Sequence, residues 1–128
     1  MVLSDEDKMQ IVNISRTEPF ITKDNSEIRE ILSPRNSSLE NQSLAEARVS
    51  PGKATIQHYH VKTEEIYYIL QGRAEIIVEG EVKEVVEGDG IVILPGQKHR
   101  IWNTGDEDLV FLCCCAPAYE DEDTVLFE

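Results

Sequence analysis

The stretch IQHYHVKTEEIYYIL, residues 56–70, carries two histidines one residue apart inside an apolar run that is typical of a β-strand. Burying titratable side chains without partners is unfavourable, so imidazoles on a buried strand need a function or a partner. Side chains two residues apart share one face of a strand, which puts His58 and His60 on the same face as Ile56. If that face is the interior of the fold, both imidazoles point inward.

Two further titratable side chains fall on neighbouring strands in the same phase. Glu65 alternates with Tyr67 on the next strand, and His99 follows a Pro-Gly turn and alternates with Ile101. Three imidazoles and one carboxylate on adjacent inward faces could converge on one point, and such a donor set binds a divalent transition metal. The candidate metal ligands are therefore His58, His60, Glu65 and His99.

Short strands separated by regular turn signals must position these side chains. Turn-forming residues recur at positions 51–52, 71–72, 79–80, 88–90, 95–96 and 104–105. Between them lie ATIQHYH, EIYYIL, RAEIIVE, EVKEVVE, IVIL, HRIWN and DLVFLCCC, most of them rich in β-branched or aromatic residues. Many short strands at close spacing predict an all-β antiparallel sandwich or barrel.

The two ends of the chain have weaker patterns. Residues 1–18 are charged and weakly patterned, so we expect a flexible tail or an arm that docks on the fold. SEIREIL, residues 26–32, is interpreted as a strand and not as a helical turn, because Pro34 ends it early. The apolar quartet TVLF near the C-terminus could add a last strand or cover one end of a barrel.

Length and charge restrict the class of protein. With 128 residues the chain can form one domain with a substantial core. A net charge of −13 makes nucleic acid and anionic membranes unfavourable partners, and no apolar run is long enough to span a bilayer. The acidic N-terminus lacks the layout of a signal peptide, so we expect a cytoplasmic protein.

The cysteines do not fit a structural bridge. Cys113, Cys114 and Cys115 are consecutive, which suits neither a disulfide framework nor a zinc motif. We interpret them as small apolar side chains on a core strand, with a reactive thiol near a pocket as the alternative.

The histidine segments resemble the two motifs of the cupin superfamily. GKATIQHYHVKTEEIYYILQG matches the first, Gly-x5-His-x-His-x4-Glu-x6-Gly, through Gly52, His58, His60, Glu65 and Gly72. GDGIVILPGQKHRIWN matches the second, Gly-x5-Pro-x-Gly-x2-His-x3-Asn, through Gly88, Gly96, His99 and Asn103, with Leu94 in place of the proline. Residues 73–87 separate the motifs, as in compact single-domain cupins.

This resemblance implies a double-stranded β-helix, a jelly-roll barrel, in one domain over residues 1–128 with its core at 43–115. It selects Glu65 over Glu64 as the carboxylate ligand and implies one divalent metal: Mn, Fe, Ni, Co or Zn. Neutral imidazoles and one carboxylate leave a net charge near +1 and, in an octahedral site, two open positions. Such a centre would act as a Lewis acid or would activate oxygen.

Inward-facing side chains should form a mostly apolar pocket beside the metal. The expected walls are Ile56, Tyr67, Ile69, Ile76, Val78, Ile101 and Phe111. Tyr67 is a candidate catalytic residue for a proton relay or a substrate hydrogen bond, with a core aromatic as the alternative. Arg48 is a second candidate if it faces inward, where it could bind an anionic group, although arginines usually lie at the surface. Asn103 is expected to tie its loop by hydrogen bonds.

Three functions remain open for this small-molecule site. Similarity to cupin phosphohexose isomerases, such as mannose-6-phosphate isomerase-like cupins, predicts a sugar or sugar-phosphate isomerase, which needs a base and a phosphate-binding group. Similarity to cupin dioxygenases predicts an Fe enzyme with an apolar pocket. A module that binds or senses a ligand without turnover is the third. The reactions known in the family, and not the residues, place the isomerase slightly ahead of the dioxygenase. Unpaired edges at SEIREIL or in the first twenty residues predict a homodimer.

Overall fold

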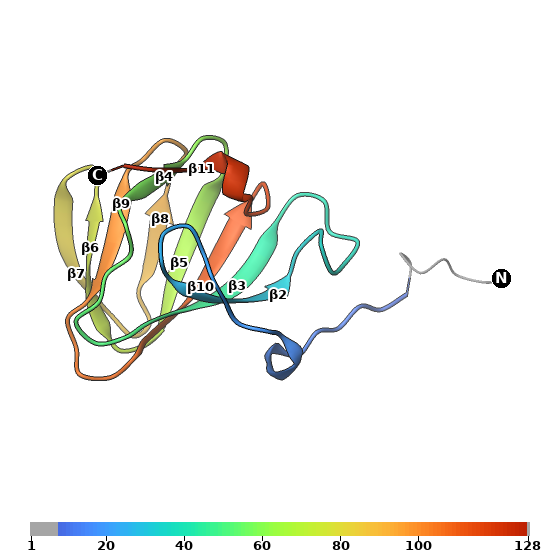
Figure 1. Ribbon diagram of the computed structural model, residues 1–128, viewed down its shortest axis with the longest axis horizontal. Helices are drawn as coiled ribbons and strands as arrows, with labels where there is room; N and C mark the ends of the chain where they lie inside the picture. Colours follow the sequence, from blue (N-terminus) through green and yellow to red (C-terminus); the bar gives the residue numbers. More distant parts are fainter. Residues whose placement is uncertain (1–7, 128) are drawn as a thin grey trace.

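Two antiparallel sheets form the molecule, and the computed structural model describes residues 8–127 of it (Figure 1). The larger sheet has the strand order β1-β2-β3-β10-β5-β8, and the smaller has β11-β4-β9-β6-β7. This is the all-β double-stranded β-helix that the sequence predicts. Residues 1–7 of the expected arm lie outside the described residues.

The strands lie where the apolar segments and turn signals place them. They are β1 (Phe20–Ile21), β2 (Glu27–Leu32), β3 (Ser43–Val49), β4 (His58–His60), β5 (Glu64–Gln71), β6 (Arg73–Val78), β7 (Glu81–Val86), β8 (Gly90–Ile93), β9 (His99–Asn103), β10 (Leu109–Ala116) and β11 (Thr124–Leu126). Two 3-10 turns, η2 (Ile14–Arg16) and η3 (Asp121–Asp123), complete the described elements. No helix in residues 8–127 is long and apolar enough to cross a membrane.

One predicted strand is much shorter than expected. The segment ATIQHYH forms regular pairing only at β4, and Ala54 makes a single bridge to Trp102. The backbone N–H of Ile56 instead donates to the carbonyl of Asp24 at 2.8 Å. At Ile56 the segment before the histidines is therefore held by the turn between β1 and β2, which contains Asp24.

Alternating burial along the strands forms the core between the sheets. Glu65, Tyr67 and Ile69 of β5 are buried while their neighbours are exposed, as a period of two requires. On β10, Cys113 and Cys115 are buried and Cys114 is half-buried. The cysteines thus lie on a core strand, as the sequence analysis favoured.

The turn between β1 and β2 meets the C-terminal segment beside β4. β11 pairs with β4 in antiparallel register, so the C-terminal apolar residues add a last strand (Figure 1). The Lys23 ammonium, in the turn between β1 and β2, donates to the carbonyls of Asp121 and Thr124 at 3.0 and 2.8 Å. β2 lies between β1 and β3, but β1 pairs only with Glu27 and Ile28 of β2, so it covers a small part of that edge.

The loop after β9 is held by Asn103, as expected. This fully buried side chain donates to the carbonyls of Val49 and Glu107 at 2.9 and 2.8 Å, and its oxygen accepts from the Gly105 N–H. At the β5–β6 turn, Gly72 has a φ of 89°, and a Cβ there would lie 3.2 Å from the Asp108 carbonyl oxygen. Both residues fix the ends of strands that carry the histidines and Glu65.

Candidate metal centre

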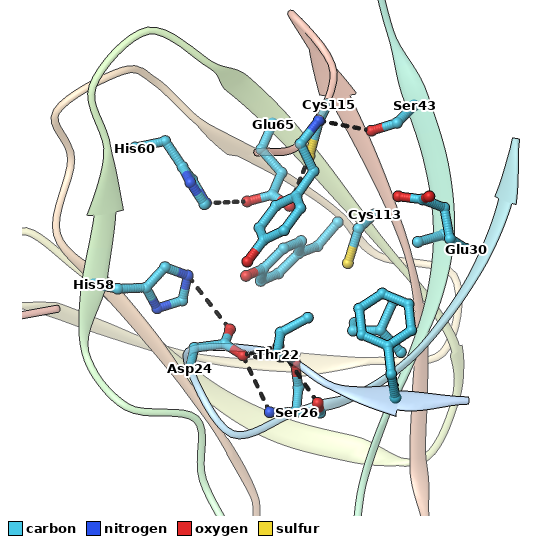
Figure 2. Close-up of a pocket in the computed structure, with 15 residues that line it drawn as sticks. Thr22, Asp24, Ser26, Glu30, Ser43, His58, His60, Glu65, Cys113 and Cys115 are labelled. Carbon is cyan, nitrogen blue, oxygen red and sulfur yellow. Dashed lines mark hydrogen bonds and ion pairs between the residues drawn. The ribbon is translucent and has the colours of Figure 1, made fainter. Parts of the chain in front are cut away.

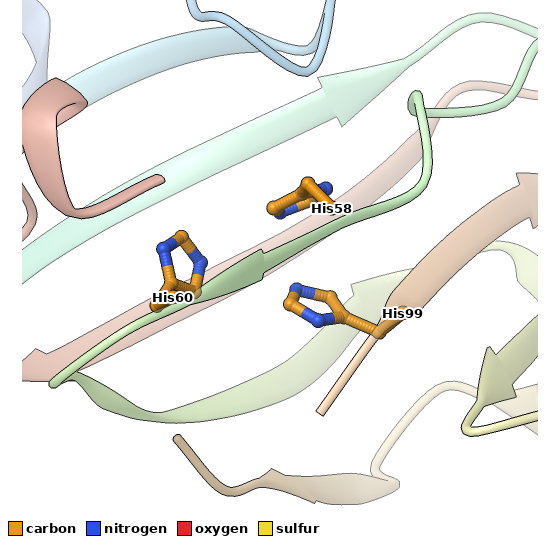
Figure 3. A group of neighbouring side chains, drawn as sticks. All are labelled: His58, His60 and His99. Atoms are coloured by element: carbon orange, nitrogen blue, oxygen red, sulfur yellow. The ribbon is translucent and has the colours of Figure 1, made fainter. Parts of the chain in front are cut away.

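The structure brings the three histidines together. His58 and His60 project from β4, and His99 begins β9 directly opposite His58 in the sheet (Figure 3). All three side chains are buried, with relative exposures of 2%, 3% and 0%. One nitrogen from each ring lies within 4.8 Å of the other two, so these residues could hold a metal ion.

Backbone carbonyls determine which nitrogen of two rings is available. Nδ1 of His58 lies 2.7 Å from the Ile56 carbonyl oxygen, and Nδ1 of His99 lies 2.9 Å from the Gln97 carbonyl oxygen. A carbonyl oxygen can only accept, so each Nδ1 must carry the proton. In the neutral imidazole this leaves the lone pair on Nε2, which is the form that binds a metal.

The third ring is oriented by a hydroxyl group. Nδ1 of His60 lies 3.1 Å from the Thr124 hydroxyl oxygen, and that hydroxyl donates to the Glu120 carbonyl at 3.0 Å. Because the hydroxyl proton is used in this way, its oxygen accepts from Nδ1–H of His60. All three rings therefore present Nε2 to the interior.

Glu65 adds a carboxylate to this cluster. Its Oε1 lies 3.2 Å from Nε2 of His60 and 3.7 Å from Nε2 of His99, while its Oε2 accepts from the Cys115 thiol. Among the described residues, Nε2 of His60, Nε2 of His99 and Oε1 of Glu65 are buried without any hydrogen-bond partner. Buried polar atoms are normally paired, and a divalent cation would satisfy all three. Glu64 is exposed while Glu65 is buried, so the geometry favours Glu65 as the carboxylate ligand.

Burial favours the uncharged form of His99. It lowers the pKa of His99 to about 4, and a positive charge on nearby His58 would act in the same direction. His99 is therefore neutral at physiological pH, as a metal ligand must be.

A small cavity of about 40 Å³ lies beside the histidines (Figure 2). It has room for a few water molecules at most. Its walls include Phe20, Thr22, Asp24, Ser26, Ile28 and Glu30 from the N-terminal region, and Cys113, Cys115 and Tyr119 from the C-terminal part. Of the apolar walls expected from the sequence, only Tyr67 lines this cavity. The prediction of the others was wrong, because residues 20–30 cover this side of the barrel. The core instead contains Ile69, Ile76, Ile101 and Phe111, with Val78 packed against it, while Ile56 is half-buried outside it.

Tyr67 lies in the cavity wall and also packs in the core. Its ring packs against that of Phe111 with centroids 4.7 Å apart and a tilt of 47°, and its centroid lies 5.9 Å from that of the His99 ring. Burial raises the pKa of Tyr67, and the charge of Glu65 raises it further. The phenol therefore keeps its proton and can donate a hydrogen bond.

Asp24 is the site residue that sequence reasoning missed. Its Oδ2 lies 3.4 Å from Nε2 of His58, and its Oδ1 accepts from the hydroxyls of Thr22 and Ser26 at 2.6 and 2.7 Å (Figure 2). The backbone N–H of Ser26 adds a third donor at 3.1 Å. No motif or periodicity includes Asp24, but the pattern Thr-x-Asp-x-Ser indicates a hydrogen-bonded turn.

Arg48 does not join the site. It is exposed on β3, lies 3.1 Å from Glu46 and 4.0 Å from Asp108, and does not line the cavity. Its neighbours Ala47 and Val49 point into the core, so the alternation along β3 turns Arg48 outward. Its candidate role in binding an anionic group is therefore corrected.

The thiols in the cavity wall are not activated. Burial raises the pKa of Cys113, and the charge of Glu65 adds to this effect. Because the thiolate is the nucleophile, a raised pKa does not support the alternative of a reactive cysteine.

Known proteins share this sequence and this fold. The family model described as Cupin domain matches residues 45–115, more than half of the chain. The chain belongs to the cupin family. An uncharacterized protein of Methanocaldococcus jannaschii is 47% identical to this cupin, over 88% of this chain and 90% of that protein.

Two further similarities concern proteins with a named activity. Polyketide synthase CurC of Streptomyces cyaneus is 30% identical, over 80% of this chain and 67% of CurC. The crystal structure of a predicted oxalate decarboxylase from Thermotoga maritima superposes with a TM-score of 0.74 at 29% identity, covering 84% of this cupin and 99% of that chain. These relatives are named for different reactions. Membership of the cupin family therefore does not identify one reaction for this chain.

Proposed function

We propose that this cupin holds one divalent transition metal through His58, His60, Glu65 and His99 and acts on a small molecule. The observation that carries the proposal is the buried group of Nε2 atoms and one carboxylate oxygen without hydrogen-bond partners. Imidazole and carboxylate donors suit Mn, Fe, Ni, Co or Zn. When bound, the metal supplies a Lewis acid that polarises a ligand oxygen.

Proton transfer on an oxygen-bearing molecule, as in an isomerase, is the reaction class we favour. The protonated Tyr67 phenol can donate a hydrogen bond to a ligand oxygen in the cavity. The carboxylate of Asp24 lines the same cavity and supplies the proton acceptor that such a reaction needs. Within the described residues, no lysine or arginine lines the cavity. An unphosphorylated substrate therefore fits better than a sugar phosphate.

We further infer that residues 1–128 act as one cupin domain with its core at 43–115 in the cytoplasm. The family match over residues 45–115 supports the core, and the described part of the arm docks through Gln10 on Ser38 at 3.1 Å. The net charge of −13 disfavours nucleic acid and membrane surfaces as partners.

Metal content tests the first part of the proposal. The purified protein is expected to carry about one metal ion per chain, and His58→Ala plus His60→Ala should remove most of it because two of four donors are lost. Gln57→Ala, on the same segment but with the side chain on the other face, is the matched control. Elemental analysis is the measurement, with circular dichroism to check folding. An unchanged metal content in the double variant would contradict the assignment of His58 and His60 as metal ligands.

Reaction class is tested with the metal-loaded protein. Incubation with the smallest unphosphorylated aldose–ketose pair, glyceraldehyde and dihydroxyacetone, in deuterated water should place deuterium on the carbon that exchanges its proton, as nuclear magnetic resonance would detect. Oxygen uptake by the Fe form with thiols or diketones would favour the dioxygenase instead. Tight ligand binding without either reaction would identify a binding module.

A further inference from the structure

The cavity beside the histidines is lined by acids. Three carboxylates, from Asp24, Glu30 and Glu65, line it, and none of the described lining residues is a lysine or arginine. The charge that a ligand meets there depends on which of these carboxylates is already neutralised by a partner.

Glu30 is neutralised from outside the cavity. Arg35 donates to both of its carboxylate oxygens, at 2.9 Å from Nε and 2.5 Å from a terminal nitrogen. The pair is held on one side of β2, so Glu30 adds little charge to the cavity.

Asp24 has no such partner among the described residues. Its Oδ1 accepts only from neutral groups, the hydroxyls of Thr22 and Ser26 and the N–H of Ser26. Its Oδ2 faces Nε2 of His58 at 3.4 Å. Because Nδ1 of His58 already carries a proton, Nε2 of the neutral ring has no proton to donate to this carboxylate. A lone pair and a buried carboxylate oxygen that face each other repel, and a divalent cation held by the histidines would offset this repulsion.

The turn that carries Asp24 is also fixed in place. The carbonyl of Asp24 accepts from the Ile56 N–H at 2.8 Å, and Thr22 N–H donates to the Ser26 carbonyl at 3.0 Å. The carboxylate is therefore attached to the segment that leads into His58, and its orientation is set by three donors. Asp24 is 9% exposed and needs a counter-charge inside the molecule.

A charge count links Asp24 to the metal. Neutral imidazoles contribute nothing, so a divalent cation with Glu65 alone leaves a buried charge of +1, whereas Glu65 and Asp24 together neutralise it. We propose, resting on the function proposed above, that Asp24 is the second counter-charge of the metal centre. The centre is then electroneutral and takes neutral oxygen ligands, such as hydroxy-carbonyl compounds, in preference to carboxylate or phosphate anions. A neutral ligand preserves the balance, while an anion adds uncompensated negative charge next to the buried carboxylates of Asp24 and Glu65.

The lining agrees with a neutral, hydroxyl-bearing ligand. Thr22, Ser26, Ser43 and Tyr67, which all carry hydroxyl groups, line the cavity wall. Such groups match hydroxyl and carbonyl oxygens without adding charge, as polar contacts in small-ligand sites commonly do.

The test compares an anion with its neutral isostere. Glycolate and glycolamide both present a hydroxyl and a carbonyl oxygen, and both can be titrated into the Co²⁺-loaded protein while its visible spectrum is recorded. Asp24→Asn should raise the affinity for glycolate relative to glycolamide by at least about tenfold, because one negative charge near the ligand is removed. Glu84→Gln makes the same change of charge at an exposed position on β7, so it should leave the ratio of the glycolate and glycolamide affinities unchanged.

The proposal is overturned if folded, metal-loaded Asp24→Asn shows no rise in the affinity for glycolate relative to glycolamide. Asp24→Ala provides a second variant if Asp24→Asn does not fold, and either one decides. Metal content is measured on each preparation, so a wild-type protein that takes up no Co²⁺ contradicts the metal site itself. Full Co²⁺ loading with an unchanged ratio contradicts only the role of Asp24.

Discussion

At the level of single residues, the His60 ring is oriented by a hydroxyl group from a distant part of the chain. Thr124 accepts from His60 Nδ1 and donates to the Glu120 carbonyl. Partners of this kind fix the ring and the tautomer of metal-binding histidines, and their loss typically weakens metal binding. Thr124 lies on β11, so the C-terminal strand orients a proposed metal ligand without offering a donor atom to the metal itself.

Thr124→Val removes this hydroxyl while keeping the shape of the side chain. We expect the affinity for a divalent metal to fall by about 10- to 100-fold, because the His60 ring loses its partner. Competition with a coloured chelator measures the affinity, and Thr104→Val, on the loop after β9, serves as the control. Equal affinities for the two variants would show that Thr124 does not orient the ring.

At the level of elements, Arg35 ties β2 to the loop that follows it and to the C-terminal segment. It donates to Glu30 and to the carbonyl of Tyr119 at 3.1 Å, and it lies 3.4 Å from the Glu120 carboxylate. Burial acts to raise the pKa of Glu30, but the hydrogen bonds from Arg35 and Ser33 and the Arg35 charge outweigh it, so this pKa is lowered.

Arg35→Gln should reduce the free energy of unfolding at neutral pH by roughly 1 kcal/mol or less, because the pair is partly exposed. A lowered pKa means that the unfolded state takes up the proton first as the pH falls. The difference between wild type and variant should therefore be full above the ordinary pKa of 4.5 and shrink as the pH falls through the lower folded value, where the bond to the Tyr119 carbonyl remains. Urea unfolding at neutral pH and at about pH 3 measures it, with Arg16→Gln, at an exposed position, as a surface control. A difference of the same size at both pH values would contradict this account.

At the level of the whole molecule, the outer face of the larger sheet has an exposed apolar stripe. It consists of Ile66, Tyr68 and Leu70 on β5, Val92 on β8 and Leu94 just after it. β8 is also the last strand of that sheet, so its edge has no partner strand among the described residues. Apolar stripes of this kind commonly mark protein–protein contacts.

We therefore expect a homodimer, and we place its contact on this stripe in preference to SEIREIL or the first twenty residues, the two edges suggested by the sequence. Light scattering should give about twice the chain mass of 14.5 kDa. Val92→Asp should shift the mass toward the monomer because it places a charge in the contact, whereas Val82→Asp on β7 of the other sheet should not. A monomeric wild type at all concentrations tested would refute the dimer.

The sequence by itself determined the strands, the turns and the inward direction of the histidines. Those signals are local: alternation along a strand decides which face His58, His60 and Glu65 occupy, and glycine at Gly72 permits a turn that other residues resist. The spacing of the two cupin motifs added the partnership with His99 across the barrel. The alternation along β3 was equally local, but its phase could not be followed across the Pro51–Gly52 turn, which left Arg48 open.

Only the tertiary structure decided what surrounds the histidines. Asp24 reaches His58 because the N-terminal hairpin folds over one end of the barrel, and Thr124 reaches His60 because β11 pairs with β4. Contacts between segments far apart in the chain leave no periodicity or spacing to read. They depend on the packing of the turn between β1 and β2 and of the C-terminal segment. Both contribute residues to the cavity wall, Asp24 from the turn and Tyr119 from the C-terminal segment.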